Sequence, residues 1–222
     1  MYINELSIYC RDLHKQQHFY TEVLGLKMID KWDDSVTFVI GKSLLRLEPS
    51  PDFKPYHFAI NIPSNQISGA LQWLRSRVVV LKDGDREIQD FTSWNAKALY
   101  FYDTDFNIVE FIARRTLQNE SESAFSQTSL LEISEIGMPT DDIERVYNAV
   151  HHKYGLPVYS GDFGGFCAIG DEHGLLICID KYNKLWYPTN DPAYSSDFKL
   201  VFTAGGEACK LRYDHGKLNI DR

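Results

Sequence analysis

Hydrophobic and polar residues alternate in three separated segments of the chain, and each segment is followed by the pattern of a helix. The alternating segments begin near Ile3, Tyr56 and Leu131. Alternation with a period of two predicts half-buried strands. A residue able to cap a helix follows each strand; these are Asp12, Ser64, and Asp141 or Asp142. Gly25 and Gly155 stand where the first and third helices should end.

Further strand candidates follow each predicted helix, so the chain contains a repeated strand–helix–three-strand module. Those of the first module are 27–30, 36–40 and 44–48; of the second, 78–82, 98–102 and 108–113; of the third, 156–160, 165–169 and 175–180. Residues 116–128 are rich in Ser, Glu and Gln and predict a polar linker. Three strand candidates without a helix, 199–203, 209–213 and 217–220, predict a fourth module reduced to its strands.

Composition excludes several classes of partner. The net charge of −8, with scattered Lys and Arg, argues against nucleic acid and against a polybasic membrane patch. No apolar run approaches the roughly 20 residues that span a bilayer. The first residues, Met1 to Glu5, contain neither a basic nor an apolar leader, so we expect a cytoplasmic protein. Cys10, Cys167, Cys178 and Cys209 form no CxxC pair and read as reduced core residues.

Two motifs in adjacent modules carry a family resemblance. The first is Leu6-x-Ile8-x-Cys10-x-Asp12 followed by Phe19-Tyr20-x-x-Val23-Leu24-Gly25-Leu26. The second, running from Trp94 to Glu110, contains Asp103-Thr104-Asp105-Phe106-Asn107 and is similar to a closing hairpin of the form F-x-D-P-D-G-N-x-x-E. Together they resemble the vicinal oxygen chelate superfamily of glyoxalases, bleomycin-resistance proteins and extradiol dioxygenases. The resemblance is clearest over residues 1–115 and weaker over 130–182.

The resemblance implies an α+β fold in which βαβββ modules form curved mixed sheets with helices on the outside. Residues 1–115 are then expected to be two modules paired edge to edge around a cavity, followed by the linker 116–128. Residues 129–222 would hold the third module and the strand-only fourth, which would pair with each other or leave an edge for a dimer.

The resemblance also implies a divalent metal site. Ligands come from the residue that opens each module's first strand and from an acidic residue in its last strand. These positions are Glu5, His57 and Glu110, with Arg46 where the first module's last-strand ligand would stand. A His or Gln is usual where Glu5 stands, and Glu48 would replace Arg46 only if the register shifts. Imidazole and carboxylate suit Fe, Mn, Zn or Ni, and a free glutamate, Glu5 or Glu110, would shuttle a proton.

Three functions remain open at this stage. The first is a metal-dependent lyase, isomerase or dioxygenase acting on a small oxygenated substrate. The second is a metal-free binding or resistance protein, in which Arg46 grips an anionic ligand and Tyr9, Trp32, Trp94 and Tyr100 form a stacking wall rather than ordinary core. The third is an interaction protein whose site is lost, with Arg46 merely paired to Glu5 or Glu110. In every case the expected partner is a small molecule, and the protein a monomer or homodimer.

The third module offers only half of a site. Glu135 stands at its first-strand ligand position, whereas Ile177 occupies the last-strand position. The sequence therefore predicts no second metal site there.

Overall fold

A computed structural model describes residues 1–32 and 34–220, and its elements follow the predicted repeat. The first module contains β1 (Tyr2–Cys10), α1 (Leu13–His18), the π-helix η1 (Phe19–Val23), β2 (Lys27–Trp32), β3 (Ser35–Ile40) and β4 (Ser43–Pro49). The second contains β5 (His57–Ile62), α2 (Ile67–Arg75), β6 (Val80–Leu81), β7 (Gln89–Phe91), η2 (Thr92–Trp94), β8 (Ala96–Tyr102) and β9 (Ile108–Arg114).

The remaining elements are the short helices η3 (Arg115–Leu117) and η4 (Gln127–Ser129), the third module and the tail. The third module contains β10 (Glu132–Thr140), α3 (Ile143–Tyr154), β11 (Val158–Asp162), β12 (Phe166–Asp171) and β13 (Gly174–Asp180). The short strands β14 (Leu185–Trp186) and β15 (Asp191–Pro192) lead to the tail strands β16 (Phe198–Ala204), β17 (Glu207–Asp214) and β18 (Lys217–Ile220).

Two of the predicted helix caps are confirmed and one is wrong. The side chains of Asp12 and Asp142 accept hydrogen bonds from the first backbone N–H groups of α1 and α3. The N-cap of α2 is Gln66 rather than Ser64. The backbone N–H of Ser64 is instead bound by the side chain of Asn119, from the segment predicted as a linker. Residues 116–128 therefore lie against the second module.

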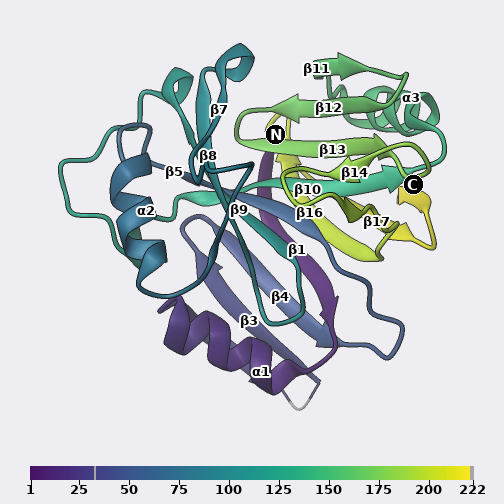
Figure 1. The fold of residues 1–222 in the computed structure, drawn as a ribbon. Helices are drawn as coiled ribbons and strands as arrows, with labels where there is room; N and C mark the ends of the chain where they lie inside the picture. The colour runs from purple at the N-terminus through teal and green to yellow at the C-terminus, as the bar shows by residue number, and fades with distance from the viewer. Residues whose placement is uncertain (33, 221–222) are drawn as a thin grey trace.

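The modules pair differently from the arrangement that we expected. The strands form a seven-stranded sheet, β18-β17-β16-β1-β4-β3-β2, and a larger sheet, β11-β12-β13-β10-β5-β9-β8-β6, with β7 paired to β8 (Figure 1). The first module thus joins the tail, through the antiparallel pair β1–β16, and the second joins the third, through the antiparallel pair β5–β10. The expected sheet of modules one and two is wrong. The reason is that every first strand presents a similar open edge, and alternation does not specify its partner.

One hydrophobic core joins both sheets and the helices. It includes Leu6 and Ile8 of β1, Ile136 and Met138 of β10, and the apolar faces of α1, α2 and α3. Strand side chains alternate between two faces. The residues of β10 that alternate with Ile136 and Met138, such as Gly137, therefore face away from this core, where a second apolar cluster gathers on the larger sheet. Among the described residues, no helix is both long enough and apolar enough to cross a membrane.

The two family motifs meet in space although they lie in different sheets. The hydroxyl of Tyr20, from the first motif, donates to the carboxylate of Asp103, from the second, at 2.9 Å. Asp103 is buried and also accepts the backbone N–H groups of Asp105 and Asn107 and the side-chain amide of Asn107. Asn107 in turn accepts the backbone N–H of Tyr56 before β5. The motifs therefore hold the first and second modules together.

A second join between the sheets forms at the β3–β4 turn. Gly41 has a positive φ of 55°, and a Cβ at this position would overlap the backbone carbonyl of Leu131. The N–H of Lys42 donates to that carbonyl at 2.8 Å. Ser43 next to it donates to the carbonyl of Ile3 and accepts the N–H of Ile133. Glycine is needed here because of both its conformation and this close approach.

We predict that Tyr20→Phe destabilises the protein by about 1–3 kcal/mol, because Asp103 loses one donor to a buried charged acceptor while the ring is retained. Urea unfolding followed by circular dichroism measures this change. Tyr182→Phe is the matched control, since Tyr182 is exposed. Equal stability of the two variants would show that the bond between the motifs contributes nothing.

We also predict that Gly41→Ala destabilises the protein more than Gly205→Ala. Both glycines have a positive φ, 55° and 58°, so both substitutions incur the left-handed conformation, about 1–2 kcal/mol. Nothing lies within 4 Å of a Cβ at Gly205, whereas Gly41 also meets Leu131. The difference in unfolding midpoint between the two variants reports the contact between the sheets. A difference of zero would contradict it.

Candidate functional site

Three ionisable residues converge on the face of the larger sheet that points away from the common core. His57 opens β5, Glu110 lies in β9 and Glu135 lies in β10. In the sheet, Glu110 and Glu135 are the register partners of Ala59 on its two sides, and His57 lies two residues before Ala59 on the same face. Their ligand atoms lie within 4.8 Å of one another, and all three residues are buried. The small side chain of Ala59 leaves room between them.

His57 is held as a neutral imidazole. Its Nδ1 lies 3.3 Å from the carbonyl oxygen of Ile108. Because a carbonyl oxygen can only accept a hydrogen bond, Nδ1 must carry the proton. Burial lowers the pKa of His57 to about 4. The proton therefore sits on Nδ1 at neutral pH, and the lone pair of Nε2, 3.4 Å from Glu110, is free to bind a cation.

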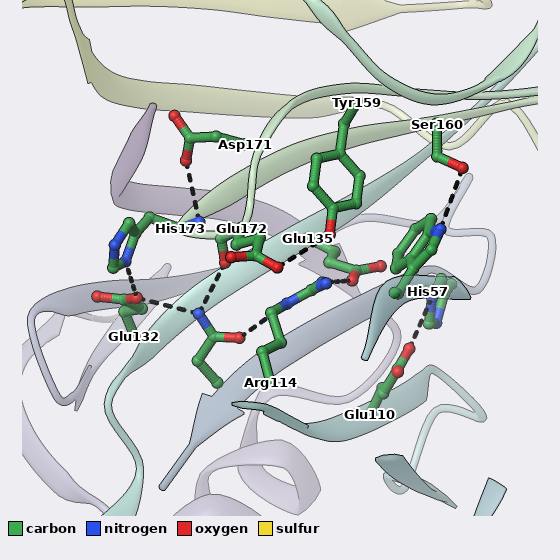
Figure 2. Close-up of polar contacts among 12 residues, drawn as sticks. His57, Glu110, Arg114, Glu132, Glu135, Tyr159, Ser160, Asp171, Glu172 and His173 are labelled. Carbon is green, nitrogen blue, oxygen red and sulfur yellow. Dashed lines mark hydrogen bonds and ion pairs between the residues drawn. The ribbon is translucent and has the colours of Figure 1, made fainter. Parts of the chain in front are cut away.

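The negative charges of Glu110 and Glu135 are only partly neutralised by the groups around them. Burial, and then the charge of Glu135, raise the pKa of Glu110, against the opposing effects of Arg114 and of a hydrogen bond from Tyr100. Burial also raises the pKa of Glu135, although its ion pair with Arg114 opposes the shift (Figure 2). Two buried carboxylates thus share one guanidinium, and their remaining negative charge favours a proton or a cation.

Arg114 is wholly buried and is fixed by a polar network behind the site. Its Nε donates to the side-chain oxygen of Asn61 at 3.3 Å, and the Asn61 amide donates to Glu132 at 3.0 Å (Figure 2). The carboxylate of Glu132 also lies 2.7 Å from Nδ1 of His173. Such a network restrains the guanidinium, and hence the orientation of Glu135. Arg114 bonds Oε1 of Glu135 and leaves the second oxygen for another partner.

A cavity of about 450 Å³ lies over these residues. His57, Glu110 and Glu135 belong to its wall, with Tyr100, Trp94 and Ile177 from the sheet and its loops. Trp186 and Tyr187, from the connection after the third module, close another side. Most of this lining is apolar or aromatic, which is typical of a small-molecule site with a few polar groups at one end.

The donor set fits a divalent transition metal. One free imidazole nitrogen and two carboxylates are ligands that Fe, Mn, Zn and Ni accept. Three protein ligands leave coordination positions open toward the cavity. A hydrogen bond from Nδ1 to a backbone carbonyl, as His57 makes, is the usual way of orienting a metal-binding imidazole.

The structure brings together only some of the residues predicted from sequence. His57, Glu110, Trp94 and Tyr100 all line the cavity. Glu5, Tyr9, Arg46 and Glu48 lie in β1 and β4 of the other sheet, and none of them lines it. Trp32, at the end of β2, is 62% exposed. The set Glu5, His57 and Glu110 is therefore not assembled, because the first and second modules do not share a sheet.

On the other sheet the predicted residues form a surface charge cluster. Arg46 donates to Glu48 at 3.0 Å and to the hydroxyl of Ser35 at 2.8 Å. Glu48 also pairs with Lys199 at 3.0 Å, and the ammonium of Lys199 lies over the ring of Tyr9. Glu5 accepts a hydrogen bond from Ser7. Arg46 meets neither Glu5 nor Glu110 here, so the predicted pairing with those residues is not formed.

Sequence reasoning missed the site residues that come from outside the first two modules. Glu135 had a signal, since it stands at the first-strand position of the third module, but that signal does not say which module it faces. Arg114 follows Glu110 by four residues, and its burial could not be read from the chain. Trp186 and Tyr187 lie in a turn-rich connection that belongs to no module.

Comparison with known proteins agrees with this fold. The model of the Glyoxalase/Bleomycin resistance protein/Dioxygenase superfamily matches residues 2–111. A metallothiol transferase, FosB, from Staphylococcus saprophyticus is 26% identical over 111 residues, which cover 46% of this chain and 70% of that protein. A putative dioxygenase from Bacillus subtilis has 15% identity and a TM-score of 0.60, covering 81% of this chain and 63% of that one.

A fosfomycin resistance protein, FosX, from Listeria monocytogenes is similar over 50% of this chain and 89% of its own, with 16% identity and a TM-score of 0.40. Over its first two modules, residues 2–111, the chain belongs to the glyoxalase, bleomycin-resistance and dioxygenase superfamily, as its two motifs indicated. The modular α+β fold is that of its structural neighbour.

We predict that Glu110→Gln stabilises the metal-free protein at pH 8 but not at pH 4.5. The folded pKa of Glu110 lies above its unfolded value, so the stability it contributes is present at low pH and is lost as pH rises through the folded pKa. Each unit of upward shift corresponds to about 1.4 kcal/mol. Unfolding of both proteins in EDTA across this pH range, taken as a difference, cancels the contribution of titrating groups that lie away from Glu110.

Glu48→Gln is the control with the opposite sign. Burial opposes ionisation of Glu48, but Lys199 and Arg46 lower its pKa overall. Its contribution is therefore present above its unfolded pKa and is lost on acidification, so this variant should be less stable than the wild type at pH 8. A Glu110→Gln variant that is also less stable at pH 8 would contradict the description of the site as poorly compensated.

Proposed function

We propose that this protein is a divalent-metal-dependent enzyme acting on a small oxygenated molecule, with the metal held by His57, Glu110 and Glu135. The observation that carries the proposal is the convergence of these three donors, all buried, in the wall of a cavity. Membership of the superfamily, and a relative named as a metallothiol transferase, are consistent with it. The proposed reaction is of the lyase, isomerase, transferase or dioxygenase type.

Each residue of the site has a separate role in the proposed reaction. A bound metal supplies a Lewis acid that polarises a substrate oxygen. The Nδ1–H group of His57 stays hydrogen-bonded to the carbonyl of Ile108, so that Nε2 remains available as a metal ligand. Arg114 orients Glu135 and limits the negative charge of the site. Glu110, the register partner of Tyr100, would both hold the metal and accept a substrate proton on its carboxylate.

Two other functions remain less well supported. A metal-free binding protein that uses Arg46 would need that guanidinium in the cavity, but it is paired with Glu48 on the other sheet. A protein with a lost site would fill its cavity with its own side chains, whereas about 450 Å³ is open here. Both arguments favour the metal-dependent reading.

The test is metal content, measured by plasma mass spectrometry on tag-free protein purified without chelator and reloaded with Mn, Fe, Ni or Zn. We expect about one ion per chain in the wild type and a loss of at least tenfold in affinity in Glu135→Gln, because a ligand is removed. His57→Ala and Glu110→Gln should behave alike.

Glu5→Gln is the matched control, because Glu5 is the ligand that the module order predicts and it lies on the other sheet. It should retain the metal of the wild type. Loss of metal in Glu5→Gln with retention in Glu135→Gln would reverse the assignment. A wild type that takes up none of the four metals would refute the proposed function.

A further inference from the structure

The walls of the cavity are lined by a continuous series of aromatic rings. We call it the aromatic belt, and it consists of Phe91, Trp94, Tyr100, Phe166, Trp186 and Tyr187. Along the belt, ring centroids lie 6.0 Å apart for Tyr100 and Tyr187, 6.0 Å for Tyr187 and Phe91, 6.4 Å for Phe91 and Trp94, and 6.2 Å for Trp94 and Phe166. His57 connects Trp186 to the Tyr100 end of this series, with its ring centroid 4.9 Å from that of Trp186 and 6.2 Å from that of Tyr100.

Two members of the belt come from a segment outside the βαβββ modules. We call residues 181–197, between β13 and β16, the strap. Its Trp186 rests directly on Gly137 of β10, where a Cβ would come within 2.7 Å of the indole Cζ2. Gly137 lies two residues after Glu135 and so on the same sheet face. The absence of a side chain at Gly137 allows the indole to lie against the sheet, and Trp186 is only 8% exposed.

The strap is fastened across the cavity to the second module. The hydroxyl of Tyr187 shares its one proton between two acceptors, the side-chain oxygen of Gln89 at 2.7 Å and the carboxylate of Asp83 at 3.1 Å. The hydroxyl of Tyr102 donates to Asp191 on the other side of the strap turn. These bonds set the position of the Tyr187 ring, which is 43% exposed and forms the rim. The ring faces of the belt are thus held in place before any ligand arrives, which lowers the entropic cost of stacking.

We call His57, Glu110, Arg114 and Glu135 the floor of the cavity, and their summed charge limits the charge of the ligand. With a divalent cation bound, two carboxylates, one guanidinium and the neutral His57 leave a net charge of about +1 in a buried site. A ligand with a single negative charge therefore neutralises the floor, whereas a neutral ligand leaves the buried charge uncompensated.

We propose that the ligand is a planar aromatic monoanion, and that Trp186 and Tyr187 of the strap determine this specificity. The charge part of this inference rests on the proposed function, and the aromatic part rests on the belt alone. Aromatic rings pack on one another in offset or edge-to-face geometry, which a saturated ring of the same size does not reproduce.

Three probes of similar size separate shape from charge. They are salicylate, its saturated counterpart cis-2-hydroxycyclohexanecarboxylate, and the neutral salicylamide. Calorimetric titration of Mn-loaded protein should give salicylate an affinity about tenfold higher than either of the other two. Equal affinity for salicylate and the saturated acid would overturn the aromatic part, and equal affinity for salicylate and salicylamide would overturn the charge part.

Variants of the strap test its role. In Trp186→Leu and in Tyr187→Leu, the preference for salicylate over the saturated acid should fall toward one, with metal content retained. Tyr182→Leu is the control, because Tyr182 lies in the strap but is 76% exposed and does not line the cavity. An unchanged preference in both belt variants would remove the strap from the specificity assignment.

The same titration keeps this inference separate from the proposed function. A protein that takes up no metal but still prefers salicylate to the saturated acid would refute the metal centre and support the belt. A protein that holds metal and shows no such preference would support the metal centre and refute the belt.

Discussion

The hydrogen-bonded pairing of β5 with β10 decides the composition of the candidate site. It places Glu135 on one side of Ala59, while the parallel pairing with β9 places Glu110 on the other. His57 lies on the same face two residues earlier, so the three donors come together on three adjacent strands and no loop contributes a donor. Had β5 paired with β1 instead, Glu5 would have been the acidic residue offered at that edge. A change of strand partner thus exchanges one ligand for another while every strand keeps its own sequence pattern.

The second constraint is electrostatic. Two buried carboxylates line the cavity, and Arg114, itself fully buried, can neutralise only one of them. Removing charges from water is costly, and a buried carboxylate persists only with a partner. The network through Asn61 and Glu132 keeps Arg114 where it is needed. The remaining charge is what makes a cation the natural complement of this site.

The two sheets differ in what they carry on the face that points away from the common core. In the larger sheet, Ala59 leaves space between the three donors, Gly137 admits the indole of Trp186, and the strap and the belt line a cavity above them. In the other sheet, the corresponding face carries Arg46, Glu48 and Lys199, which satisfy one another. The first module still supports the site indirectly, because Tyr20 hydrogen-bonds to Asp103 in the hairpin that leads into β9. This contact gives the family motifs a structural meaning independent of any ligand.

Local rules of the chain were sufficient for the elements and for part of the site. Alternation and capping residues such as Asp12 and Asp142 located the modules, since these signals act within a few residues. The motifs located His57 and Glu110, because each position is defined within its own module. Ser64 shows the limit even locally, since the N-cap of α2 is Gln66, two residues further along the chain.

Tertiary structure alone decided which modules share a sheet, and therefore that Glu135 rather than Glu5 completes the site. The open edges of β1, β5 and β10 have similar patterns, so their pairing depends on the packing of the whole chain. The same holds for the burial of Arg114 and for Trp186, whose place over Gly137 depends on the path of the strap. Sequence by itself determined the modules and two of the donors; the assembly of the third donor, the counter-charge and the aromatic walls required contacts between residues far apart in the chain.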